Sequence, residues 1–94
     1  IYEQQAILNN SQNSWADIID FYFDDSLTNS FKALINVTVS AGSDKYAIWE
    51  LNGLYKPSGW VITSSFSGDL TGVQFSILNK DGGIGQIQYQ NSNT

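Results

Sequence analysis

The sequence predicts an all-β domain, an antiparallel β-sandwich or a flattened barrel of about six to eight short strands. Two observations predict this class. Apolar and polar residues alternate with a period of two over most of the chain, as in strands that bury one face. Turn-forming residues interrupt the alternation at Gly42, Gly53, Pro57, Gly68 and Gly82, at a spacing that suits a meander of short strands.

A chain of 94 residues has room for one hydrophobic core. We therefore expect residues 1–94 to form a single β-domain. The chain begins with Ile1 rather than Met and ends in the polar run 90–94, so we expect the domain to be a segment of a longer, fibre-like chain. Residues 1–8 can be read as a strand that continues from a preceding region.

The clearest strand covers residues 31–40, followed by a turn at 41–44 and a return strand at 45–51. In this first strand only Leu34 breaks the alternation. The residues expected on its apolar face are Phe31, Ala33, Ile35, Val37 and Val39. Asn52 and Gly53 come next, and they predict either a turn or a bulge inside one long strand.

Three further strands are expected in the second half of the chain, at residues 60–66, 73–77 and 85–89. They are separated by a turn at 56–59, a loop at 67–72 and a turn at 80–83. The side chains expected to point inward from these strands are Trp60, Ile62, Phe66, Val73, Phe75, Ile77, Ile87 and Tyr89.

Residues 15–23 fit two structures. A short amphipathic helix would begin at Ser14, a good N-cap residue. The period-two spacing of Ile19, Phe21 and Phe23, with aromatic and β-branched residues enriched, favours a strand.

Composition excludes several classes of function. The chain has no histidine, no cysteine and no arginine, so the usual general bases, thiol nucleophiles and phosphate clamps are missing. We expect no catalytic residues and no cofactor. A net charge of −5 disfavours binding to nucleic acid or to an anionic membrane surface. No apolar stretch approaches the ~20 residues of a membrane span, so we expect no membrane insertion.

Asp17, Asp20, Asp24 and Asp25 form the densest group of acidic residues. Calcium prefers several oxygen ligands around a turn, but this spacing matches no EF-hand loop. We therefore expect a solvated loop edge and no metal site. The run 82–85 is glycine-rich but lacks the Lys-Ser/Thr pair of a phosphate-binding loop, so we expect a hairpin turn there.

The aromatic residues are the strongest candidates for binding. Aromatic rings stack on sugar faces, and amides and carboxylates hydrogen-bond sugar hydroxyl groups. The candidate binding residues, for a glycan or a partner protein, are Trp15, Trp49 and Tyr55. Core packing is the alternative for each ring. Trp60 is expected in the core because it is in phase with Ile62.

The order of these segments resembles a β-domain of tailed-phage virion and tail-fibre proteins. The resemblance rests on an Asn-rich connector, an aromatic strand, a strand of the form F-x-A-L-I-x-V-x-V at 31–39, and the later segments 46–51, 54–56, 58–60, 67–77 and 85–89. It covers most of residues 9–90. The chain departs from the pattern in a longer loop at 79–84 and in Trp15-Ala16-Asp17, which leaves any ligand open.

The resemblance implies a structural or host-contacting module of a virus or phage appendage, located on the virion surface. It also implies partners: other virion proteins, sister copies of the chain, often as a trimer, and a host-surface glycan. It brings no catalytic residues. The alternative is a carbohydrate-binding module of a secreted or cell-surface protein.

Overall fold

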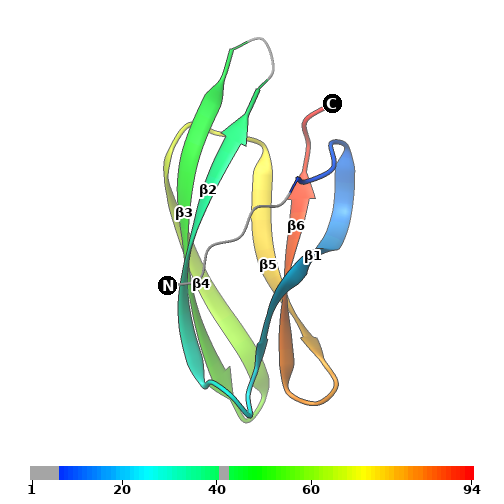
Figure 1. Cartoon of the computed structure of the whole chain (residues 1–94), viewed down its shortest axis with the longest axis vertical. Helices are drawn as coiled ribbons and strands as arrows, with labels where there is room; N and C mark the ends of the chain where they lie inside the picture. The colour runs from blue at the N-terminus through cyan, green and yellow to red at the C-terminus, as the bar shows by residue number, and fades with distance from the viewer. Residues whose placement is uncertain (1–6, 41–42) are drawn as a thin grey trace.

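The computed structural model describes residues 7–40 and 43–94. These contain six strands: β1 (Gln12–Asp24), β2 (Ser30–Val39), β3 (Lys45–Lys56), β4 (Gly59–Gly68), β5 (Val73–Lys80) and β6 (Ile84–Asn91). Two three-stranded antiparallel sheets, with strand orders β1-β6-β5 and β2-β3-β4, pack face to face as a small sandwich (Figure 1). The predicted all-β class is confirmed. The described residues include no helix of the length and apolarity that a bilayer crossing requires.

Two connections carry the chain from one sheet to the other. Residues 25–29 join β1 to β2 at one end of the sandwich, and residues 69–72 join β4 to β5 at the opposite end (Figure 1). The predicted turns at 56–59 and 80–83 are confirmed as the β3–β4 and β5–β6 hairpins. In the predicted turn at 41–44, residues 41 and 42 lie outside the described residues, and the flanking strands pair as expected.

The prediction of a turn or bulge at Asn52-Gly53 is wrong. Strand β3 runs through both residues, and its pairing with β2 and with β4 continues without a shift. Gly53 is opposite Phe31, and a Cβ atom at Gly53 would overlap the Phe31 ring. The glycine is therefore required for close packing inside the strand rather than for a change of direction.

The core lies between the two sheets and follows the predicted alternation in most strands. Trp60, Val73, Phe75, Ile87 and Tyr89 are buried, as predicted. Phe66 also faces the other sheet, but its side chain remains 41% exposed. The ring of Phe23 in β1 stacks on that of Phe31 in β2, with 3.7 Å between ring centroids, so this aromatic contact joins the two sheets.

Residues 15–23 belong to strand β1 and not to the alternative helix, but the residues of β1 that face the core do not follow a regular period of two. Ile19 is 80% exposed and Ile18 is buried, so Ile19, Phe21 and Phe23, which are spaced two apart in the sequence, do not share one face. The reason is a bulge: Asp20 has φ of 63°, and the register with β6 shifts between Asp17 and Tyr22. Two inward residues, Ile18 and Phe21, are consequently three positions apart.

The predicted strand at residues 1–8 falls largely on residues 1–6, which lie outside the described residues. Ile7 and Leu8 do not belong to a strand. Leu8 packs against the core, whereas Ile7 is exposed. The backbone N–H of Asn9 donates to the Tyr89 hydroxyl at 3.0 Å, which holds this segment against β6.

Candidate binding face

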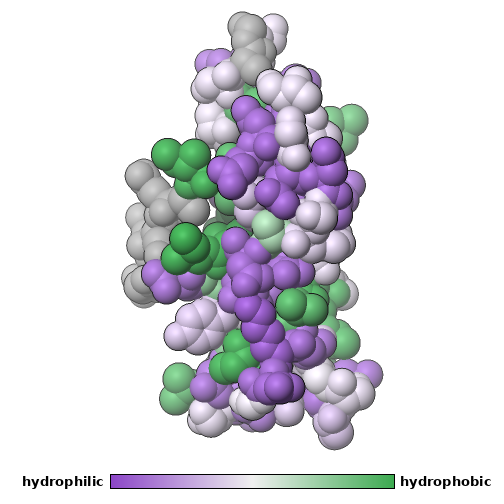
Figure 2. All heavy atoms as spheres, turned by 90° about the vertical axis from the view of Figure 1, so that its right-hand side faces the viewer, coloured by the Kyte–Doolittle hydropathy of each residue, from purple (hydrophilic) through white to green (hydrophobic). Residues whose placement is uncertain are grey.

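Three glutamines lie on the outer surface of sheet β1-β6-β5, beside the Asp17–Lys80 ion pair and the exposed Leu78. Since Ile87 and Tyr89 of β6 face the core, alternation directs Gln88 and Gln90 outward. Gln74 of β5 pairs with Gln90, which extends the row of amides to the neighbouring strand. We name this surface the amide face and define it by Trp15, Asp17, Gln74, Ser76, Lys80, Gln88 and Gln90. Figure 2 shows a band of hydrophilic residues along it.

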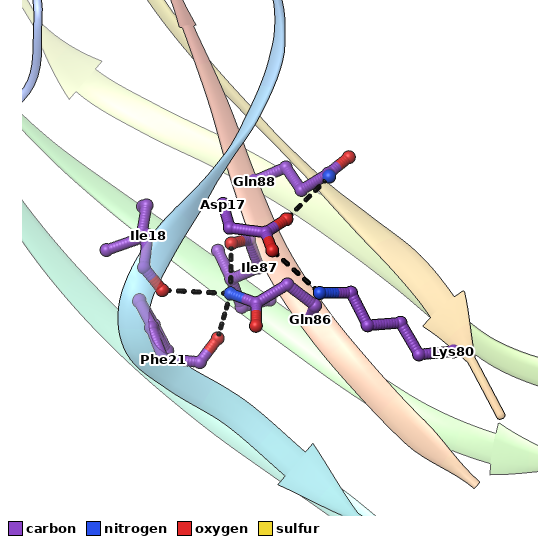
Figure 3. Close-up of polar contacts among 7 residues, drawn as sticks. All are labelled: Asp17, Ile18, Phe21, Lys80, Gln86, Ile87 and Gln88. Atoms are coloured by element: carbon purple, nitrogen blue, oxygen red, sulfur yellow. Dashed lines mark hydrogen bonds and ion pairs between the residues drawn. The ribbon is translucent and has the colours of Figure 1, made fainter. Parts of the chain in front are cut away.

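Asp17 connects the three strands of the amide face. One of its carboxylate oxygens accepts from Lys80 Nζ at 2.6 Å, and the other accepts from Gln88 Nε2 at 2.8 Å (Figure 3). These contacts, with the Lys80 bond as the larger cause, lower the pKa of Asp17 below its usual value of 3.8. The carboxylate is therefore ionised at neutral pH, and the ammonium beside it compensates its charge.

Gln86 has a different role from the other glutamines, because its side chain is buried. Its Nε2 group donates to the carbonyl oxygens of Ile18, Phe21 and Ile87, at 2.8, 3.1 and 2.9 Å (Figure 3). Two of these carbonyls belong to the β1 bulge, where the ladder to β6 is interrupted. Gln86 thus stabilises the bulge and does not contribute to the exposed surface.

A shallow depression lies at one end of the amide face. Its volume is about 170 Å³, and its lining is polar apart from one glycine: Gln12, Asn13, Gly72, Gln74, Gln90 and Ser92. The side-chain amides of Gln74 and Gln90 make no hydrogen bond to another described residue, so they are free to bind a ligand. Typical small-molecule pockets have volumes of roughly 300–1,000 Å³. This depression is therefore smaller than a typical small-molecule pocket.

A second hollow, of about 480 Å³, lies beside the β1–β2 connection and includes Asp20 and Asp24 in its lining. Asp24 Oδ1 accepts from the Ser26 backbone N–H at 2.9 Å and from its hydroxyl at 2.8 Å. These bonds, the backbone bond first, lower the pKa of Asp24. Within residues 7–40 and 43–94, no three histidine, cysteine or acidic side chains converge as they would around a metal ion.

The three candidate binding residues lie in three different places. Trp15 of β1 is 42% exposed and lies two positions before Asp17, in the stretch where the register of β1 against β6 shifts. Trp49 of β3 faces the core. Its ring stacks on Phe66, with centroids 4.8 Å apart, and meets Phe75 edge-on at 5.3 Å. Only Trp15 therefore belongs to the amide face.

Tyr55 lies at the end of β3, packed edge-on against Trp60 with ring centroids 5.3 Å apart. The negative charge of Asp25 nearby raises the pKa of Tyr55. Tyr55 therefore packs beside Trp60 and is part of the sheet β2-β3-β4, opposite the amide face.

The glutamines of the amide face are not among the binding residues predicted from the sequence. Gln86, Gln88 and Gln90 alternate with inward residues, so the sequence indicates that they share one face. The meeting of Gln88 and Gln90 with Gln74 and Asp17 depends on the strand order β1-β6-β5, which places β6 between β1 and β5. No local pattern in the sequence indicates that order.

Comparisons of this chain with protein-family models, with curated proteins and with solved structures found no match.

Proposed function

We propose that this chain is a structural or host-contacting module of a virus or phage appendage, with no catalytic role. The observation that carries the proposal is its form: a two-sheet body with extents of 44 × 25 × 20 Å, its strands running along the long axis (Figure 1). An elongated body of paired strands suits a module that acts as a rigid spacer in a fibre and exposes its loops. The resemblance to virion β-domains that we inferred from the sequence, over most of residues 9–90, is the second basis of the proposal.

Mass spectrometry of purified virions tests this proposal. The chain has four basic residues, all lysines, and the Lys56-Pro57 bond resists trypsin. Residues 33–45 therefore form a short diagnostic peptide between Lys32 and Lys45. We expect that peptide in the particle fraction, in constant ratio to a major virion protein across a density gradient. Its recovery only in a secreted or cell-wall fraction free of particles would contradict the proposal.

The amide face favours a second function, binding of a neutral carbohydrate. Amide groups both donate and accept, as sugar hydroxyl groups do, and the two amides of the shallow depression have no described protein partner. Trp15 offers an exposed aromatic ring on the same face. The ion pair of Asp17 with Lys80 leaves this surface with little net charge, and the chain's net charge of −5 opposes anionic sugars.

A glycan array followed by calorimetry with soluble neutral polysaccharides tests this second function. We expect Trp15→Ala and the double variant Gln74→Ala with Gln90→Ala to reduce affinity at least tenfold. Tyr46→Ala is the matched control, because Tyr46 is an exposed aromatic residue (57%) on the other sheet. If the wild-type chain binds no neutral glycan, or if Tyr46→Ala weakens binding as much as Trp15→Ala, the amide face is not the site.

A further inference from the structure

The sandwich has four edge strands, and three of them carry features that discourage pairing with another chain. Strand β1 is bulged, β2 carries Lys32, and β5 ends in Lys80. Strand β4 has none of these features. Its segment 61–67 has no charged residue, no proline and no shift in its pairing with β3.

The hydrogen-bonding pattern identifies which backbone groups of β4 face outward. The Asp69 N–H donates to the Tyr46 carbonyl at 2.9 Å, which makes these two residues a hydrogen-bonded pair. Since bonded pairs alternate along an antiparallel ladder, the residues of β4 that bond to β3 are Val61, Thr63, Ser65 and Ser67. Ile62, Ser64 and Phe66 therefore direct their N–H and C=O groups toward the free edge.

Trp60 lies on the same free edge and supports this assignment. Its backbone N–H donates to Asn79 Oδ1 at 2.6 Å, and its carbonyl accepts from Asn79 Nδ2 at 3.2 Å. The Asn79 side chain thus takes the place of a strand at one end of the edge. At Ile62, Ser64 and Phe66, no strand among the described residues takes that place.

We propose that a second copy of this chain pairs with this edge, β4 against β4 in antiparallel orientation, about a twofold axis at Ser64. The register places Ile62 of each copy opposite Phe66 of the other. The two β2-β3-β4 sheets then become one six-stranded sheet. This surface is the same on both copies, as a twofold dimer requires.

Three properties of β4 favour a second copy as the occupant. Segment 61–67 carries no charge, so two copies can pair there without placing like charges opposite each other, although each chain has a net charge of −5. The register forms two aromatic–aliphatic cross-strand pairs, which stabilise sheets. The side chain of Phe66 faces inward but is 41% exposed, and the second copy would bury more of it. This inference stands independently of the proposed function.

Charge substitutions at the twofold position test the dimer. Ser64 is exposed, so Ser64→Lys and Ser64→Glu should fold. Each variant places like charges opposite each other in the dimer. We therefore expect analytical ultracentrifugation to show a dimer dissociation constant at least tenfold higher than that of the wild-type chain. A mixture of the two variants should form a heterodimer, because opposite charges then face each other. Asn36→Lys, an exposed position on β2, is the control and should dimerise like the wild-type chain.

Residue-resolved hydrogen exchange tests the register. We expect the amide protons of Ile62, Ser64 and Phe66 to exchange at least tenfold more slowly as the protein concentration rises. Those of Val61, Thr63 and Ser65 should change less, because β3 already binds them. A wild-type chain that stays monomeric at millimolar concentration would overturn the inference. So would an oligomer in which the first three amides exchange unchanged.

Discussion

Two glycines within strands, Gly53 and Gly85, are required by the aromatic side chains that pack against them, Phe31 on the neighbouring strand of the same sheet and Trp60 on the opposite sheet. Glycine is ordinarily unfavourable in a strand because it packs nothing and loses conformational freedom. A Cβ atom at Gly85 would lie 2.7 Å from Trp60 Cγ and 2.8 Å from Ile77 Cδ1. A Cβ atom at Gly53 would overlap the ring of Phe31, its partner on the neighbouring strand β2. The close packing of these aromatic rings therefore requires that Gly53 and Gly85 have no side chain.

Gly53→Ala tests this reading. The added methyl group overlaps the Phe31 ring, so we expect the free energy of unfolding to fall by about 1–3 kcal/mol, the usual cost of overpacking. Urea denaturation measures the loss. Asn52→Ala, at the exposed neighbouring position, is the control and should change stability by less than about 0.5 kcal/mol. If the Phe31 ring is the cause, Phe31→Leu combined with Gly53→Ala will cost less than the two separate losses added together.

At the scale of the element, the bulge in β1 decides which residues reach the core. The bulge needs a residue in the left-handed region, which Asp20 tolerates better than a β-branched residue would. It also leaves the carbonyl groups of Ile18 and Phe21 without a strand partner, and Gln86 supplies the missing donors. The element thus depends on a side chain from a strand that is distant in sequence.

Gln86→Leu should destabilise the protein by about 1–3 kcal/mol, because it removes a buried donor and leaves carbonyl oxygens unsatisfied. Gln88→Leu makes the same chemical change at the next outward position of β6, where the amide bonds the exposed carboxylate of Asp17. We expect that control to change stability by less than about 0.5 kcal/mol. Equal losses in urea denaturation for the two variants would show that Gln86 has no special role in the bulge.

At the scale of the whole molecule, the central strand of one sheet is the last strand of the chain. Strand β6 lies between β5 and β1, and its pairing with β1 joins Asn91 to Gln12. The pairing of β1 with β6 therefore joins segments that are separated by most of the chain. Such distant pairing makes folding slow for a protein of this size and links both sheets in one transition.

We expect unfolding in urea to be a single cooperative transition. Tryptophan fluorescence, which reports Trp15 in one sheet and Trp49 and Trp60 in the other, should give the same midpoint as circular dichroism. The free energy of unfolding should be about 5–14 kcal/mol, from roughly 0.05–0.15 kcal/mol per residue. Refolding should take milliseconds to seconds. Separate midpoints for the two probes would contradict a single cooperative transition.

Period-two alternation and turn residues were sufficient to predict the all-β class, strands β2 to β6 and two of the hairpins. The inward positions of Trp60, Phe75 and Ile87 follow from the same alternation. These features are local, since the pleat of a strand and the conformation of a turn depend on adjacent residues. The glutamine content of the amide face is likewise present in the sequence, as the outward half of the β6 pattern.

The strand order, the exposed side of Ile19 and the separation of Trp15 from Trp49 appear only in the tertiary structure. Each depends on contacts between distant segments: β6 enters between β1 and β5, the bulge needs Gln86, and Trp49 needs Phe66 and Phe75 beside it. Alternation says which residues share a face of one strand. Which face is buried, and which strands lie together, is decided by the packing of the complete sandwich.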